Sequence, residues 1–111
     1  PETEGLIGAE SIATMKQNAV IINVARGEVI EEGALAAALK AKKIGGAGID
    51  VFAEEPPRPD CPLLGLAGEN IILSPHIAGV TAESKMRIMG MSMSNLVRVM
   101  KGGEPENVVN G

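Results

Sequence analysis

A short apolar run rich in β-branched residues, AVIINVA at residues 19–25, decides which folds this chain can adopt. Such a run predicts a strand that is buried on both faces, as the strands of parallel sheets are. The segments GAGIDVF (46–52) and NIILS (70–74) predict two further buried strands. Residues 31–43 predict a helix between the first two strands, with glutamates at its start and lysines at its end. A strand, a helix and a strand in this order are typical of a parallel sheet, so the predicted fold class is α/β.

Two more helices are predicted outside this unit. One covers residues 8–17, and a longer one runs from a cap at Thr81 to about Lys101, where Gly102 ends it. The loop at 53–69 contains four prolines, which exclude a long helix there. Loops of this length in compact domains are usually functional or disordered.

The composition excludes several classes of function. The net charge is −4, which argues against a protein that binds nucleic-acid phosphates. Phe52 is the single aromatic residue, so the chain lacks the stacking surfaces that single-stranded nucleic acids require. No apolar run reaches the length of a membrane span, and no signal-peptide pattern opens the chain. The lone Cys61 excludes an internal disulfide and is typical of the cytoplasm, and the start at Pro1 predicts that the chain is part of a longer protein.

Polar side chains follow each of the three predicted strands. Arg26 comes after the first strand, Asp50 lies near the end of the second with Glu55 five residues later, and His76 follows the third. In open parallel sheets, ligands bind at the carboxyl ends of the strands. We therefore expect an arginine, two carboxylates and the chain's one histidine to meet at one edge of the sheet.

Each of these residues also has an ordinary structural interpretation. A single histidine is more often structural than catalytic, and Arg26 could be a surface residue. Asp50 could cap a turn, and Glu55 could belong to a solvated acidic pair with its neighbour. The segment Gly46-Ala47-Gly48 looks like a dinucleotide fingerprint, but it runs into a strand instead of opening a helix. The chain is therefore predicted to lack a phosphate-binding glycine loop, and no metal site is predicted.

Three ordered motifs carry a resemblance to a known family. They are MKQNAVIINVARGEVIEEGALAAAL (15–39), GGAGIDVFAEEP (45–56) and NIILSPHIAGVTAES (70–84). Together they resemble the D-isomer-specific 2-hydroxyacid dehydrogenases, which include phosphoglycerate, glycerate and D-lactate dehydrogenases. The resemblance implies the second half of a doubly wound, Rossmann-like NAD-binding domain. By this comparison residues 1–101 end in the long connecting helix, and residues 102–111 begin the return to a substrate-binding domain.

The resemblance also implies roles for individual residues. Arg26 would bind the substrate carboxylate and carbonyl, His76 would be the acid/base, and Glu55 would be the partner of the histidine. Asp50 would hold the nicotinamide end of the cofactor. The implied cofactor is NAD, with NADP not excluded, and the positions expected to line it are Val24, Ala25, Arg26, Asp50, His76, Ile77, Ala78 and Gly79.

The residue types suit the implied reaction. Reducing a 2-keto acid adds a hydride to the carbonyl carbon and a proton to its oxygen, and histidine side chains titrate at about pH 6.5 in model peptides. A carboxylate beside the ring orients it, while an arginine fork matches a carboxylate. The predicted function is an NAD-dependent oxidoreductase that interconverts a D-2-hydroxy acid and its 2-keto acid. The alternative is a non-catalytic dinucleotide-sensing or scaffolding relative, although Arg26, Glu55 and His76 together favour the enzyme.

Further expectations concern the intact enzyme. The resemblance implies a cytoplasmic homodimer whose partner molecules are small 2-keto and 2-hydroxy acids, with no nucleic acid or membrane. The 111-residue chain alone is expected to be inactive, because it lacks the glycine loop for the pyrophosphate and the second domain that closes the cleft.

Overall fold

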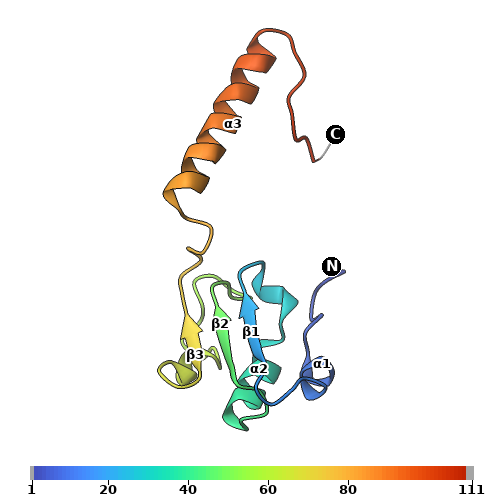
Figure 1. The fold of residues 1–111 in the computed structure, drawn as a ribbon, viewed down its shortest axis with the longest axis vertical. Coiled ribbons are helices and arrows are strands. Elements are labelled where there is room, and N and C mark those ends of the chain that lie inside the picture. Colours follow the sequence, from blue (N-terminus) through green and yellow to red (C-terminus); the bar gives the residue numbers. More distant parts are fainter. Residues whose placement is uncertain (1, 110–111) are drawn as a thin grey trace. The chain divides into compact units, whose positions relative to one another are not determined.

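The computed structural model describes residues 2–109, which divide after Ala78 into two compact units (Figure 1). The first unit contains the sheet and the second contains one long helix.

The first unit is built on a parallel sheet of three strands. These are β1 (Val20–Asn23), β2 (Gly46–Ile49) and β3 (Ile71–Leu73), in the spatial order β1-β2-β3. The helix α2 (Glu32–Lys40) connects β1 to β2, and the short α1 (Ala9–Ala13) precedes β1 (Figure 1). The predicted α/β class and the parallel pairing of the first two strands are confirmed.

The first strand ends two residues earlier than predicted, at Asn23. The side chain of Asn23 accepts a hydrogen bond from the backbone N–H of Ala25 at 3.1 Å and donates one to the carbonyl of Arg26 at 2.9 Å. This local ring of hydrogen bonds competes with strand pairing and turns the chain. Two short 3-10 helices, η1 (Gly27–Val29) and η2 (Leu64–Leu66), were also not predicted.

The core lies on one face of the sheet. Leu35 and Leu39 of α2 and Ile12 of α1 are almost fully buried against the inward residues of the strands, such as Ile49. Leu63, beside η2, joins the same cluster. The leucines one turn apart in α2 therefore form the buried side that the sequence predicts.

The opposite face of the sheet is apolar and exposed. Ile22, Gly48 and Ile72 lie in register across the three strands, and the two isoleucines are 72% and 76% exposed. The prediction that the first strand is buried on both faces is therefore wrong for β1 in this chain, and β3 is only partly buried. The reason is that α1 and α2 pack into a single cluster with the other face. A parallel sheet is buried on both faces only where helices cover both, and the helices of the first unit cover one.

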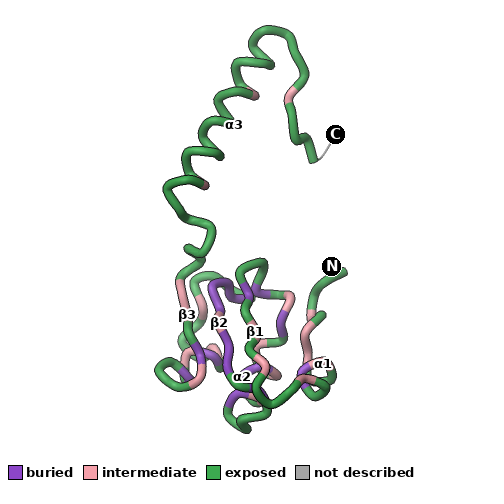
Figure 2. The backbone as a smooth tube through the Cα atoms, in the orientation of Figure 1, coloured by how far each residue is buried: buried purple, intermediate pink, exposed green. Residues whose placement is uncertain are grey.

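The second unit consists of α3 (Ala82–Met100) and the segment that follows it. Thr81 and Ser84 form a reciprocal capping box at the start of this helix, as expected for a helix that begins after Thr81. Glu106 folds back on the helix, accepting a hydrogen bond from Arg98 at 2.6 Å. No residue of the helix is buried (Figure 2). The assignment of residues 1–101 to one domain and of 102–111 to a return segment stays a prediction.

Candidate active site

The turn after β1 brings Arg26 to the carboxyl edge of the sheet. Arg26 is exposed, and its guanidinium donates to the carbonyl of Ala25 at 2.7 Å. The next residue, Gly27, is buried against the backbone of Phe52 and Ala53. A Cβ at Gly27 would lie 1.9 Å from the carbonyl carbon of Phe52. Only glycine lets the arginine turn pack this closely on the segment that leads to Glu55.

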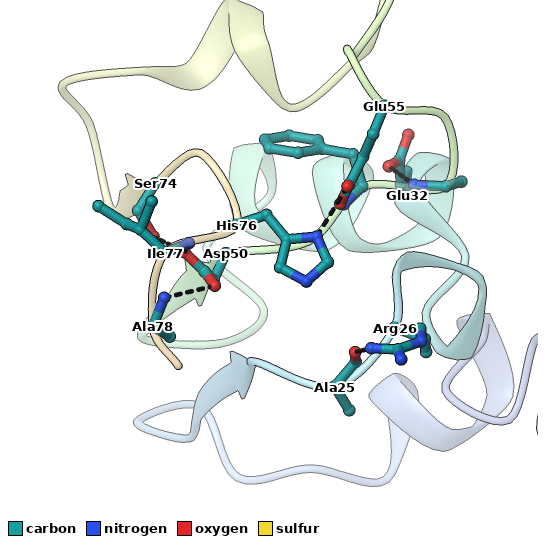
Figure 3. Close-up of polar contacts among 11 residues, drawn as sticks. Ala25, Arg26, Glu32, Asp50, Glu55, Ser74, His76, Ile77 and Ala78 are labelled. Carbon is teal, nitrogen blue, oxygen red and sulfur yellow. Dashed lines mark hydrogen bonds and ion pairs between the residues drawn. The ribbon is translucent and has the colours of Figure 1, made fainter. Parts of the chain in front are cut away.

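His76 and Glu55 form a direct contact at this edge. Nδ1 of His76 lies 2.7 Å from Oε2 of Glu55, and Oε1 of Glu55 accepts the backbone N–H of Phe52 at 3.1 Å (Figure 3). The hydrogen bond from His76 and that from Phe52 hold the pKa of the Glu55 carboxyl below its usual value. Because an ionised carboxylate only accepts hydrogen bonds, Nδ1 carries a proton and Nε2 is left for a ligand.

Asp50 lies at the end of β2 and is only 3% exposed. Its carboxylate accepts the hydroxyl of Ser74 at 2.5 Å and the backbone N–H groups of Ile77 and Ala78 at 2.9 Å each (Figure 3). The Ser74 hydroxyl lowers the pKa of the Asp50 carboxyl most, and the two N–H groups lower it further against the opposing effect of burial. Asp50 is therefore an ionised group that accepts three hydrogen bonds from the protein.

A pocket of about 200 Å³ joins three of the predicted residues. Its lining includes Arg26, Glu55 and His76, together with the Phe52–Ala53 backbone segment. A second pocket, of about 430 Å³, shares Glu55 and His76 but is otherwise lined mainly by apolar side chains and prolines. His76 and Glu55 thus line two pockets, and Arg26 lines the smaller one.

The other predicted cofactor positions follow the strand ends. Val24 and Ile77 are 60% and 53% exposed, whereas Ala78 is tied to Asp50 through its N–H group. Ala25 belongs to the Asn23 turn. Gly79 is the first residue of the second unit, so it does not belong to the geometry of the first unit.

Two polar contacts at this edge were not predicted from the sequence. Ser74 supports Asp50, and Glu32 of α2 accepts the backbone N–H of Ala53 at 2.9 Å and the thiol of Cys61 at 3.4 Å. Burial, and secondarily the nearby Glu32, raise the pKa of the Cys61 thiol. In the sequence Glu32 is a typical acidic residue at a helix start, and nothing in the local pattern indicates contacts 21 and 29 positions away.

Residues 2–109 contain no group of three or more histidine, cysteine, aspartate or glutamate side chains that could hold a metal ion. Within the same range, no helix is long and apolar enough to cross a membrane.

Comparison with known proteins identifies the family. Residues 1–78 match the family model described as D-isomer specific 2-hydroxyacid dehydrogenase, NAD binding domain. The chain belongs to this family. The matched residues include Arg26, Glu55 and His76, and the predicted Rossmann-like fold of a 2-hydroxyacid dehydrogenase is confirmed.

Individual members of the 2-hydroxyacid dehydrogenase family are also similar. The chain is 44% identical over 109 residues to a glyoxylate reductase of Korarchaeum cryptofilum, covering 98% of this chain and 32% of that protein. It is 44% identical over 110 residues to a hydroxypyruvate reductase of Blautia hydrogenotrophica, covering 99% and 33%. A crystal structure of D-lactate dehydrogenase with NAD+ from Lactobacillus jensenii has a TM-score of 0.88 and 32% identity, covering 99% of this chain and 36% of that one. The chain thus spans about a third of the length of these relatives.

The residues of this chain fit one end of a dinucleotide. Val24 and Ile77 offer exposed apolar surface next to Arg26 and His76 in the sequence, where a nicotinamide ring can pack. Oδ2 of Asp50 accepts a hydrogen bond from Ala78, so it retains one lone pair for a further donor. Residues 2–109 contain no glycine-rich loop that leads from a strand into a helix, which is the usual pyrophosphate site. The fit therefore extends to the nicotinamide end alone.

Proposed function

We propose that this chain supplies the acid/base residues of an NAD-dependent 2-hydroxyacid dehydrogenase. The observation that carries the proposal is the 2.7 Å contact between His76 Nδ1 and Glu55 Oε2, at a pocket that Arg26 also lines. A protein that only binds a dinucleotide needs neither a proton donor nor a carboxylate-binding arginine. The non-catalytic alternative is thus the less favoured one.

His76 moves the proton through its Nε2 atom. In the reducing direction Nε2–H donates to the carbonyl oxygen of the 2-keto acid, and in the oxidising direction Nε2 accepts the hydroxyl proton. Glu55 accepts a hydrogen bond from Nδ1 and so keeps the ring turned toward the pocket. The bound nicotinamide cofactor supplies or removes the hydride.

Arg26 binds and polarises the substrate. Its planar fork matches the carboxylate of a 2-keto acid with two parallel hydrogen bonds, and its charge favours negative charge developing on the adjacent oxygen. Because its guanidinium is exposed and lines the pocket with His76, it is free to meet a substrate carboxylate. Asp50, Val24, Ala25 and the segment 76–79 would lie along the nicotinamide end of the cofactor.

The substrate class is a small 2-keto acid and its D-2-hydroxy acid. The names of the relatives from Korarchaeum and Blautia support glyoxylate and hydroxypyruvate as the first compounds to test. NAD is the proposed cofactor, with NADP as the competing one. The complete protein is proposed to be a cytoplasmic homodimer, and the lone cysteine is consistent with a reducing compartment.

The test is turnover by the complete protein with glyoxylate, hydroxypyruvate and pyruvate, using NADH and NADPH in parallel. His76→Ala should lower kcat by about 10²–10⁴-fold and leave the cofactor dissociation constant within about threefold, because only proton transfer is lost. Gln17→Ala, an exposed position before β1, is the control and should keep full activity. Unchanged turnover in the His76 variant would contradict the proposal. Cofactor binding without turnover of any 2-keto acid would support the sensing or scaffolding alternative.

A further inference from the structure

The backbone at His76 adopts a conformation that few residues use. Its φ is +54°, in the left-handed region, where side chains other than glycine are uncommon. Such a conformation is strained and persists only where the surrounding contacts fix it. The backbone N–H groups of residues 76–78 all donate to one residue, Asp50.

Three successive backbone N–H groups converge on Asp50. The N–H of His76 donates to the Asp50 carbonyl at 2.8 Å, and those of Ile77 and Ala78 donate to its carboxylate at 2.9 Å each. The Ser74 hydroxyl adds a fourth hydrogen bond from the other side of His76. Figure 3 shows the segment wrapped around the Asp50 side chain, with the His76 ring turned toward Glu55.

Burial makes these hydrogen bonds decisive. Asp50 is 3% exposed, whereas the side chains of His76 and Glu55 are 51% and 38% exposed. Hydrogen bonds to a buried charge are stronger than those between exposed groups, and leaving such a charge unpaired is costly. The contact with Glu55 lies in solvent and fixes only the ring, while the Asp50 contacts fix the backbone that carries the ring.

We infer that Asp50 is a positioning residue for His76: its buried carboxylate holds the 74–78 segment in the one conformation that points the imidazole at Glu55 and the Arg26 pocket. This inference rests on the proposed function, and it goes beyond a role for Asp50 as a cofactor ligand. Three of the four carboxylate lone-pair positions are already taken by the protein's own donors. At most one lone pair of the carboxylate is left for the cofactor. Most of its hydrogen bonds therefore hold the protein's own backbone and Ser74 in place.

The informative variant is Asp50→Asn, because it keeps the shape and removes the charge. Its amide nitrogen would face a hydroxyl or an N–H group that also needs an acceptor, so one or more of the three donors loses its partner. The matched variant Ser74→Ala removes a single hydroxyl and leaves both N–H contacts. If Asp50 acts by positioning, the two variants should show the same pattern of effects, with the larger amplitude in Asp50→Asn.

The experiment combines three measurements on the complete protein. They are kcat with a 2-keto acid, the NADH dissociation constant by fluorescence titration, and the imidazole NMR signal of His76, assigned by its loss in His76→Ala. For Asp50→Asn we expect kcat to fall about 10- to 100-fold, the loss of one or two charge-assisted hydrogen bonds. The NADH dissociation constant should change by less than about threefold, since binding energy comes from the rest of the cofactor. The imidazole signal should shift or broaden, and amide hydrogen exchange at 76–78 should accelerate.

The outcomes separate this inference from the proposed function. An NADH dissociation constant that rises as much as kcat falls, with an unchanged His76 signal, would show that Asp50 is a cofactor ligand and overturn the inference. If the wild-type protein turns over no 2-keto acid, the proposed function fails, while the NMR signal and exchange rates still test the positioning. If Asp50→Asn does not fold, Ser74→Ala decides: an unaltered His76 signal and exchange in that variant would contradict the inference.

Discussion

The two partners of the proposed proton-transferring pair, His76 and Glu55, are held in place by different means. His76 lies on a five-residue segment wrapped around the buried Asp50, with its own backbone N–H bonded to that residue. Glu55 lies on a longer, exposed, proline-rich segment. That segment is held by close packing at Gly27, and by the half-buried Glu32 through the N–H of Ala53.

The difference indicates a division of labour. The group proposed to carry the proton must be held within about 0.5 Å of its productive position relative to the substrate, and its segment has the more buried and more numerous hydrogen bonds. The group that only orients the ring tolerates a looser attachment, because a carboxylate can reach Nδ1 from a range of backbone positions. Variants of the two segments should therefore differ in the size of their effects and in what they disturb.

Among variants of these two segments, Gly27→Ala is expected to lower the stability of the fold most. The new Cβ would lie within 2.3 Å of three backbone atoms of Phe52 and Ala53, so the segment that carries Glu55 must move. Overpacking of this kind destabilises a protein by about 1–3 kcal/mol, and kcat should fall as well because Glu55 loses its place. The urea unfolding midpoint and kcat of the complete protein measure the two effects.

Gly33→Ala is the matched control for this variant. Gly33 lies in α2, and a Cβ there would meet nothing within 4 Å. Alanine in an exposed helix position stabilises by about 0.5–1 kcal/mol relative to glycine, so the midpoint should stay or rise. Equal destabilisation by both variants would show that the close approach at Gly27 does not hold the Glu55 segment.

Acid should disturb the His76 segment more than the Glu55 segment. The pKa values of the Asp50 and Glu55 carboxyls are both lowered in the folded protein. A lowered pKa means that the carboxylate stabilises the fold above its unfolded value, about 3.9 for Asp and 4.3 for Glu, and that this stability is lost as the pH falls through the folded value. The urea midpoint should therefore fall as the pH drops below about 4.

The comparison between variants sharpens this prediction. Asp50→Asn should flatten the acid dependence of the midpoint more than Glu55→Gln, because Asp50 accepts three hydrogen bonds and is buried. Glu69→Gln, at an exposed loop position, controls for the loss of one surface carboxylate. A flatter curve for Glu55→Gln than for Asp50→Asn would reverse the proposed ranking of the two attachments.

The sequence predicted the sheet well because the sheet depends on local patterns. Short apolar runs separated by an amphipathic helix are sufficient to indicate parallel strands, and the polar residues at their ends converge as expected. The early end of β1 was missed because it depends on the hydrogen-bonding geometry of one side chain, Asn23. The exposed outer face shows that burial depends on what covers a strand, which the strand's own residues do not encode.

The site was predictable only in part, for a related reason. Strand-end positions indicated that Arg26, Asp50 and His76 would share an edge, but the pairing of His76 with Glu55 came from the family resemblance. The hydrogen bonds that Asp50 accepts from the 76–78 backbone come from N–H groups, which every residue except proline has, so no residue pattern marks them. The contacts of Glu32 depend on how the proline-rich loop closes, and periodicity carries no information about that.

The smallest effect on kcat is expected from variants of Glu32. The contact of Glu32 with Cys61 is best measured through the reactivity of the Cys61 thiol. The Glu32 carboxylate accepts the Cys61 thiol at 3.4 Å, and after burial it contributes to the raised pKa of that thiol. Glu32→Gln removes the charge but keeps an oxygen that can accept the Ala53 N–H, so kcat should fall by less than about threefold. Because the thiolate is the reactive form, Cys61 in Glu32→Gln should react faster with iodoacetamide at a fixed pH, as peptide mapping would show.

Glu32→Ala, which also frees the Ala53 N–H, should lower kcat further at a similar rate of alkylation. Identical alkylation rates in wild-type protein and Glu32→Gln would mean that Glu32 does not contact the thiol in solution, and packing at Gly27 would then be the principal attachment of the Glu55 segment.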